Sequence, residues 1–300
     1  MSKLDSKRNS IGLKIFANAV FIFLCLCCVV PMLLVLSISL TPDKDIGLYG
    51  YQLIPKALTF EAYAYILKYF TNIYRSYGVT IFVTVVGTVA GVAITSMVAY
   101  PLSRKDLKYR NAISMFLFFT MLFNGGLVAS YILITRYLHL KNNILVLILP
   151  MLVSPWNVML MRNFFSSSVP FSIIEAAKID GASEFGAFLR IVVPISKPTF
   201  ATIALFLALG YWNDWWLALM YIDEPSLYPL QYTLQSILLN IQVMLNNANL
   251  SNQMQDAMKE IPTENSRMAL CMLATIPILF AYPFFQKYIV SGLTVGSVKG

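Results

Sequence analysis

Six apolar stretches of this chain are each long enough to cross a lipid bilayer as a helix. They are Leu13–Leu40, Tyr77–Ser103, Ala112–Thr135, Ile144–Phe164, Ile195–Met220 and Met268–Val290. A bilayer core of about 30 Å requires about 20 apolar residues in a helix, and backbone amides in lipid must pair within their own segment. The sequence therefore predicts an all-α polytopic membrane protein with six transmembrane helices, organised as a single transmembrane domain over residues 1–300.

The composition supports lipid as the solvent for most of the chain. Of the 300 residues, 58% are hydrophobic and only 12% are charged, against about 25% charged in soluble domains. The first apolar stretch exceeds the ~7–15 residues of a signal-peptide core, so we expect a retained anchor. The net charge of +8 reports loop orientation rather than nucleic-acid binding. The four cysteines lie in apolar runs and there is one histidine, so neither a metal site nor a disulfide framework is expected.

Lysines and arginines are distributed unevenly between the two sides of the predicted membrane. They gather before the first span, between the second and third, between the fourth and fifth, and after the sixth. On the other side, in the outer loops 41–76, 136–143 and 221–267 taken together, acids and bases balance. The excess of cations in alternate loops predicts that both termini, and the loop 165–194, lie in the cytoplasm.

The loop 165–194 has the local signals of two short helices joined by a tight turn. Pro170 suits a helix start, and Asp180-Gly181 is a turn signal within "EAAKIDGASEFGAFLRIVVP", which ends at Pro194 before the fifth span. Its small residues would let another protein's backbone approach closely, and its carboxylates, Glu184 among them, could pair with Arg or Lys. On the residues alone, the loop is either such a docking element or an ordinary connection.

This loop resembles the "EAA…G" loop of bacterial ABC-importer permeases. The resemblance is carried by Glu175-Ala176-Ala177, Asp180-Gly181-Ala182, Phe188, Ile191 and Pro194. The stretches "NGGLVASYILITRYLHLKNN", "WNVMLMRNFF" and "GLTVGSVKG" (residues 292–300) are similar to the carbohydrate-uptake branch, which includes maltose-type permeases and importers of complex oligosaccharides.

The resemblance implies a type I importer permease fold, in which this loop is the coupling helix that docks on a separate ATPase subunit. The residues that carry over to coupling are Glu175, Ala176, Ala177, Asp180, Gly181, Ala182 and Pro194. It further implies a second homologous permease, two ATPase subunits, an extracellular solute-binding protein, an oligosaccharide substrate and a bacterial plasma membrane. The chain has no GxxxxGK[ST] motif, so ATP and Mg are expected on the partner ATPase and no cofactor on this chain.

Polar and aromatic residues within two spans are candidates for the substrate pathway. They are Asn124, Gly125, Trp212, Asn213, Asp214 and Trp215. Unwound backbone at membrane depth is tolerated where it lines a cavity, and an ionisable side chain in a span is a functional hypothesis by default. The alternatives are an interfacial aromatic belt for the tryptophans and helix packing for the glycines. The spacing of Trp212, Trp215 and Trp216 places them on one helical face.

Two other classes of function are alternatives to a non-catalytic transport subunit. An ion-coupled secondary transporter would need buried carboxylates in the spans, where only Asp214 is close. An intramembrane enzyme would need a catalytic pair, and the predicted spans contain no Ser–His or two-Asp arrangement.

Overall fold

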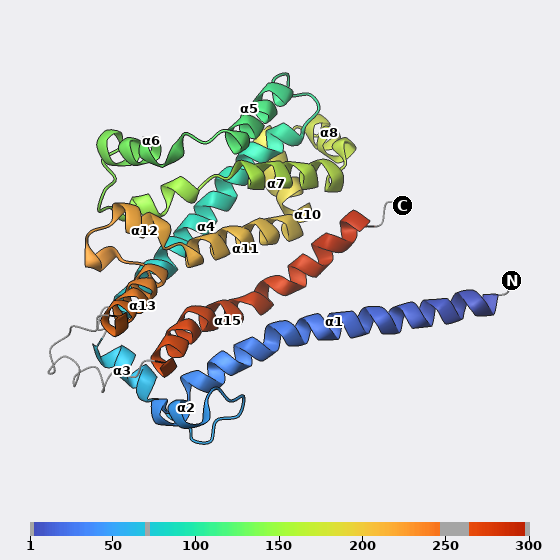
Figure 1. The fold of residues 1–300 in the computed structure, drawn as a ribbon. Coiled ribbons are helices and arrows are strands. Elements are labelled where there is room, and N and C mark those ends of the chain that lie inside the picture. The colour runs from blue at the N-terminus through green and yellow to red at the C-terminus, as the bar shows by residue number, and fades with distance from the viewer. Residues whose placement is uncertain (1–2, 70–72, 247–263, 298–300) are drawn as a thin grey trace. The chain divides into compact units, whose positions relative to one another are not determined.

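The computed structural model describes residues 3–69, 73–246 and 264–297, and within these ranges it contains helices and turns but no strand (Figure 1). The all-α prediction is confirmed. The chain divides into two compact units, one made of Met1–Thr71 with Leu238–Ile276 and the other of Asn72–Ile237 with Pro277–Gly300. The single transmembrane domain over residues 1–300 stays a prediction.

The first unit contains the long N-terminal helix and two short helices. Its elements are α1 (Lys3–Ser39), α2 (Asp43–Tyr49), α3 (Glu61–Tyr69), the end of α13 (Leu230–Asn246) and the beginning of α15 (Glu264–Ser297). The Ser39 Oγ lies 2.9 Å from the Tyr63 hydroxyl, which fixes the end of α1 against α3. The Asn265 side chain donates to the Thr41 carbonyl at 3.2 Å, which joins α15 to the loop after α1.

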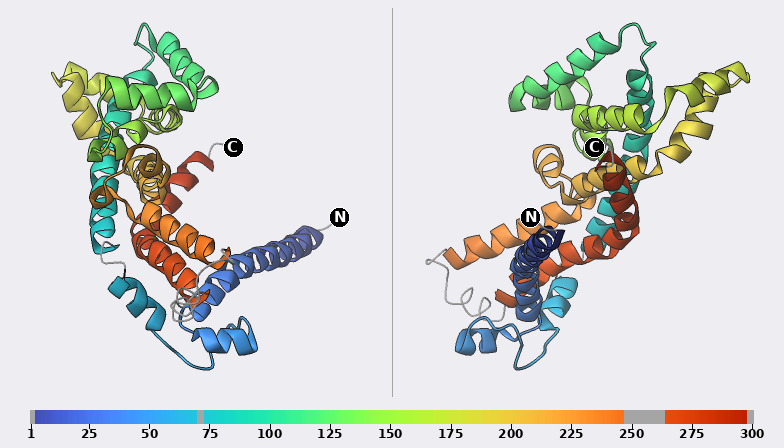
Figure 2. Two further views of the ribbon diagram at one scale, coloured as in Figure 1. Left: turned by 60° about the vertical axis from the view of Figure 1, so that its left-hand side comes forward. Right: turned by 90° about the vertical axis from the view of Figure 1, so that its right-hand side faces the viewer.

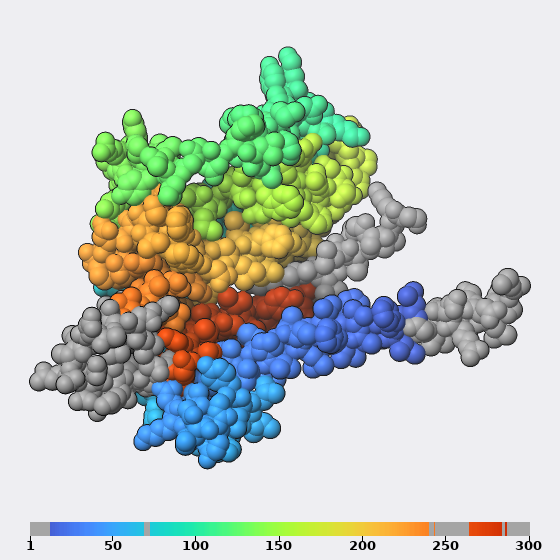
Figure 3. All heavy atoms as spheres, in the orientation of Figure 1, coloured from blue at the N-terminus to red at the C-terminus, as the bar shows by residue number. Residues whose placement is uncertain are grey.

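The second unit is built around α4 (Ile73–Ser103), which packs along α7 (Pro155–Ser168) and α11 (Lys197–Asn213). Its other helices are α5 (Arg110–Leu122), α6 (Gly126–Ile132), α8 (Phe171–Ile179), α9 (Glu184–Ala187), α10 (Val193–Ile195), α12 (Trp216–Tyr221) and the start of α13 (Leu230–Asn246). Short π-helical and 3₁₀ turns cover Leu133–Tyr137, Phe188–Val192, Ile144–Leu147, Leu149–Met151 and Pro225–Leu227. In Figure 3 the atoms of α5 and α6, in green, form one edge of this unit's surface.

Three helices are long and apolar enough to cross a membrane alone, namely Leu13–Ser39, Ile73–Ser103 and Glu264–Pro283. Three pairs meet the same criterion only together. They bend by 109° (Arg110–Leu122 with Gly126–Tyr137), 48° (Ile144–Met151 with Pro155–Ser168) and 84° (Glu184–Ile195 with Lys197–Asn213). The described residues therefore hold three to six candidate spans, and six are reached only if each bent pair counts as one.

In the structure, the third and fifth predicted spans are each broken rather than continuous helices. The chain turns between α5 and α6, where Gly126 has a φ of +85° and its N–H donates to the Asn124 side chain at 2.8 Å. In the fifth span, α11 ends at Asn213, and Asp214 is extended before α12. Mean hydropathy over a window measures how apolar a segment is, and it carries no information about the direction of the chain.

Glycines let α11 approach α4 closely inside the second unit. A Cβ built on Gly87 would lie 2.5 Å from the Tyr211 ring. That ring is itself held, because the Tyr211 hydroxyl donates to the Ile148 carbonyl at 2.9 Å. On the same face, a Cβ on Gly91 would lie 3.0 Å from the Leu152 carbonyl oxygen. These glycines act in helix packing, as small residues do between transmembrane helices.

Replacing Gly87 with alanine should destabilise the protein, whereas the same change at Gly78 in the same helix should not. The added methyl at Gly87 must displace a hydrogen-bonded ring, and overpacking of this kind costs about 1–3 kcal/mol. Nothing lies within 4 Å of a Cβ at Gly78, so helix propensity favours alanine there. Thermal unfolding of the purified protein in detergent measures both. Equal melting temperatures for the two variants would contradict this packing role.

Candidate functional site

The loop that resembles a coupling element folds as a helix–turn–helix, which we call the foot and define as residues 170–195. Pro170 precedes α8, Gly181 takes a φ of +84° at the turn, and the Ser183 side chain accepts from Gly186 N at 3.1 Å to cap α9. Only glycine adopts such a positive φ without steric cost. Figure 2 (right) shows the foot projecting from the rest of its unit. The predicted helices and turn are therefore present.

The tip of the foot is exposed and combines small, apolar and acidic residues. Glu175, Ala176, Asp180 and Gly181 are exposed, and Ile179 is 86% exposed. Ala177 and Ala182 are partly exposed beside them, and Pro194 is exposed at the base. Within the part of the chain that the structure describes, neither carboxylate of the tip forms an ion pair. The tip is thus a low, unpaired surface with apolar area still available for burial.

The inner side of the foot packs into the core of the second unit. Ile174, Phe188 and Val192 are buried at 5%, 4% and 0% exposure. The Phe188 ring lies 5.2 Å from the ring of Tyr100 on α4, measured between centroids. One face of the foot is therefore fixed by hydrophobic burial while the tip stays outside.

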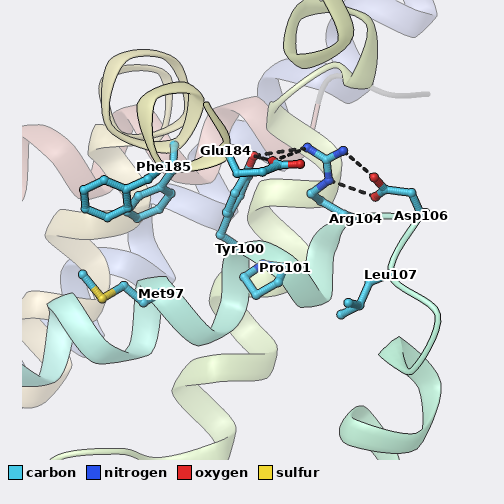
Figure 4. A pocket seen from close by; sticks show the side chains of 9 residues that line it. Met97, Tyr100, Pro101, Arg104, Asp106, Leu107, Glu184 and Phe185 are labelled. Carbon is cyan, nitrogen blue, oxygen red and sulfur yellow. Dashed lines mark hydrogen bonds and ion pairs between the residues drawn. The ribbon is translucent and has the colours of Figure 1, made fainter. Parts of the chain in front are cut away.

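A buried arginine at the end of α4 ties the foot to that helix (Figure 4). Arg104 is 6% exposed. Its Nε and Nη2 donate to the two carboxylate oxygens of Asp106 at 2.9 and 2.6 Å. Its Nη1 donates to Glu184 on α9 at 3.2 Å and to the Tyr100 hydroxyl at 3.2 Å. Lys178 on α8 completes the cluster through an ion pair with Glu184.

The charges in this cluster stabilise one another. The hydrogen bond from Arg104 lowers the pKa of Asp106, and the same bond is the largest cause of the raised pKa of Arg104. Bidentate pairs between arginine and a carboxylate are among the stronger hydrogen-bonded contacts. Because the pKa of Asp106 is depressed, the contribution of this pair to stability is present above its ordinary pKa, near 4, and is lost as the pH falls through the depressed value.

Sequence reasoning missed this link. It assigned Glu184 to the surface offered to another protein, whereas the structure pairs Glu184 inside the chain with Arg104 and Lys178. Arg104 was interpreted only as a cation that sets orientation.

The cluster of Arg104, Asp106, Glu184 and Lys178 borders a cavity of about 460 Å³. The residues that line it are Met97, Tyr100, Pro101, Arg104, Asp106, Leu107, Glu184, Phe185 and Phe188.

The structure separates the residues that sequence analysis grouped as a substrate pathway. Asn124 and Trp216 line one cavity of about 600 Å³, together with Ser130 and Tyr221. Trp212 lines a different, largely apolar cavity of about 360 Å³ between α4, α11 and the later part of α15. Gly125, Asn213, Asp214 and Trp215 line neither cavity, so their place in a pathway stays a prediction.

The shared helical face expected for three tryptophans is wrong, because the helix ends between them. Trp212 lies in α11, whereas Trp215 and Trp216 follow the break, with their rings edge-to-face at 5.8 Å between centroids. At the break, Asp214 Oδ2 accepts from the N–H of Leu217 at 3.3 Å. Asp214 therefore has a local structural partner at the start of α12, as a capping residue does.

A helical bundle with three to six candidate spans and a protruding foot defines the class as a polytopic membrane protein. The chain belongs to the family of binding-protein-dependent transport system inner membrane components, whose model matches residues 10–295. It is a multi-pass membrane protein and a non-catalytic permease subunit of an ATP-driven importer. Nothing in the family supports the ion-coupled alternative.

Individual relatives match over nearly the whole chain. Protein LplC of Bacillus subtilis (strain 168) is 39% identical over 272 residues, which cover 91% of this chain and 90% of that protein. The polygalacturonan/rhamnogalacturonan transport system permease protein YtcP of the same organism is 37% identical over 282 residues, covering 92% and 94%. A bacterial ABC transporter involved in the import of the acidic polysaccharide alginate has a similar crystal structure, with a TM-score of 0.78, 27% identity and coverage of 96% and 98%. The type I importer permease fold is thereby supported.

Replacing Arg104 with glutamine should loosen the foot and lower the number of substrate molecules imported per ATP. The variant loses the ion pairs to Asp106 and Glu184, and we expect a cost of about 1–2 kcal/mol, because both carboxylates are half-exposed and screened by solvent. Uptake and ATP hydrolysis are measured together in reconstituted complex. Arg190→Gln removes an exposed charge from the same foot and is the control. An unchanged ratio of uptake to hydrolysis in Arg104→Gln would argue against the link.

Replacing Asp214 with alanine should lower thermal stability, and Asp214→Ser should restore it. Serine keeps an oxygen that can accept from the Leu217 N–H, whereas alanine leaves that N–H without its partner, at a cost of about 0.5–2 kcal/mol. Uptake kinetics then distinguish the two roles. If Asp214 also contacts substrate, both variants change the kinetics, and unchanged kinetics of Asp214→Ala for every sugar tested would remove it from the pathway.

Proposed function

We propose that this chain forms half of the translocation pathway of an oligosaccharide importer and receives motion from a separate ATPase through its foot. The substrate class is supported by the relatives, since the names of YtcP and of the alginate transporter both refer to polysaccharides. The coupling role is supported by one observation above the others, which is an exposed small-residue tip on an element that is fixed at its base.

The tip suits docking into another protein for three physical reasons. Ala176 and Ala177 keep the surface low, so a partner's backbone can approach. Ile179, at 86% exposure, offers apolar area whose burial on docking is favourable. Asp180 and Glu175 are without ion pairs in the described residues and are available to basic groups of the partner.

The base of the foot suits transmission of force. A displacement of α8 reaches Glu184 and Lys178, then Arg104, and so the end of α4. Since α4 packs along α7 and α11, these helices would move together as a rigid body. On this proposal the coupling residues are Glu175, Ala176, Ala177, Asp180, Gly181, Ala182 and Pro194.

The other subunits of the importer are proposed from the family. This chain would pair with a second homologous permease, two ATPase subunits and an extracellular solute-binding protein. ATP and Mg would bind to the ATPase and no cofactor to this chain. We place it in the bacterial plasma membrane with both termini in the cytoplasm, which is supported by the distribution of lysine and arginine.

The cavity of about 600 Å³ is the favoured stretch of substrate pathway. Sugars stack their C–H faces on aromatic rings and exchange hydrogen bonds with amides and hydroxyls. The lining supplies both kinds of group, with Trp216 and Tyr221 as rings, and Asn124 and Ser130 as polar partners. Gly125, next to Asn124, lies at the bend between α5 and α6 that shapes one wall.

Replacing Gly181 with proline should leave the chain inserted in the membrane but abolish most uptake. Proline cannot adopt the φ of +84° and removes the N–H that donates to Lys178 O at 3.0 Å, so the tip must refold. Gly50→Pro is a matched control outside the foot, since Gly50 has a φ of +71° and its N–H donates to Ile46 O at 2.9 Å.

Uptake and ATPase activity of the reconstituted complex are measured for both proline variants. We expect Gly181→Pro to lose uptake while the ATPase subunits still hydrolyse ATP, and Gly50→Pro to retain coupling. An uptake rate of Gly181→Pro equal to that of the wild type would contradict the docking role.

A further inference from the structure

A second cavity, of about 380 Å³, shares Tyr100 and Arg104 with the one in Figure 4 and has an unusual charge. It is enclosed by the ends of α4 and α7, the start of α5 and the start of the foot. Lys105 and Arg110 line it with Arg104, and the hydroxyl-bearing Ser103 and Ser167 lie in the same wall. Its lining contains three cations and no carboxylate.

The positive charge in this cavity is not neutralised within the described chain. Arg104 is committed to Asp106 and Glu184. Arg110 forms no ion pair among the described residues, its Nη1 makes only a long hydrogen bond of 3.5 Å to the Arg104 carbonyl, and its Nε is buried without a partner there. The guanidinium of Arg162 adds like-charge repulsion to Arg110. A buried, unpartnered donor beside excess positive charge is the complement of an anion.

The lining also contains apolar residues, and the cavity sits at the end of a membrane-spanning helix. Phe165, Val169 and Ile174 belong to the lining together with the cations. The candidate span Ile73–Ser103 ends at the cavity. From Arg110, α5 continues with large apolar side chains that are exposed, such as Phe116 at 65%. The anion that fits would thus carry long apolar chains.

We propose that this cavity binds the phosphate of an anionic phospholipid, whose acyl chains lie along α5. Arg110 and Lys105 contact the phosphate oxygens. The hydroxyl protons of Ser103 and Ser167 are donated to the carbonyls of Tyr100 and Phe164, so their oxygens are acceptors for a hydroxyl-bearing headgroup. Basic pockets between transmembrane helices bind anionic headgroups by the same chemistry. A carboxylate of a partner protein satisfies the charge but does not cover the exposed apolar side chains of α5, and inorganic phosphate likewise lacks the chains.

The test compares lipid retention by the assembled importer with and without the cation. The complex is exchanged into phosphatidylglycerol or phosphatidylcholine, and retained lipid is counted by native mass spectrometry for wild type and Arg110→Gln. We expect the wild type to retain phosphatidylglycerol selectively and Arg110→Gln to bind it about fivefold more weakly, which is the effect of one cation near a membrane surface. Lys108→Gln is the control, because Lys108 lies over the Tyr109 ring and does not line the cavity.

Further arms separate the lipid from other occupants. Arg110→Lys keeps the charge and should recover most of the retention, which shows that a folding defect is not the cause. Inorganic phosphate added to delipidated complex should not compete with phosphatidylglycerol at equal concentration, and full competition would assign the site to a free anion. Equal lipid retention by wild type and Arg110→Gln, or loss of the ATPase subunits from Arg110→Gln with lipid unchanged, would overturn the proposal.

Discussion

The Arg104 guanidinium is the contact that determines where the foot lies. Taking an arginine almost completely out of solvent is costly unless its charge and its donors are satisfied. Asp106 meets two of those donors from the next loop, and Glu184 meets another from the far side of the turn in the foot. Since a different foot position would leave this buried charge without Glu184, electrostatics favours one arrangement of foot and helix. Hydrophobic burial of Phe188 against Tyr100 favours the same arrangement.

Small residues perform two opposite tasks in the second unit. At Gly87 the Tyr211 ring occupies the space that a side chain would need, so α11 packs closely against α4. At Ala176 and Gly181 the missing bulk is left open, and the surface stays available. Transmission of a displacement needs both properties. A loosely packed bundle would deform instead of moving as a body, and a bulky tip would keep a partner's backbone at a distance. Their separation along the chain is consistent with the coupling function proposed for the foot.

Local signals in the sequence were sufficient for the foot but not for its attachment. Pro170 and the Asp180-Gly181 turn act on neighbouring residues, so helix, turn and helix could be predicted. Arg104 and Glu184 are 80 residues apart, and no periodicity relates them. Unwound backbone at Asn124 and Gly125 was one alternative that the sequence offered, but the size of the bend was not predicted, and neither was the break at Asp214. Mean hydropathy is computed without regard to the direction of the chain. The prediction that three tryptophans share one helical face was wrong because of the break at Asp214, since helical spacing holds only within a continuous helix.

Arg104 lines two cavities that differ in charge, and the difference indicates that different groups border each of them. At the first cavity Glu184 and Asp106 neutralise Arg104 and Lys178, so no outside ion is needed there. At the second cavity Arg110 keeps an unmet donor next to an exposed apolar helix. If a lipid phosphate completes that second cavity, the end of α4 is held between the foot and the bilayer surface. A push on the foot would then tilt α4 about a point fixed at the headgroups, so the opposite end of the helix would make the larger excursion.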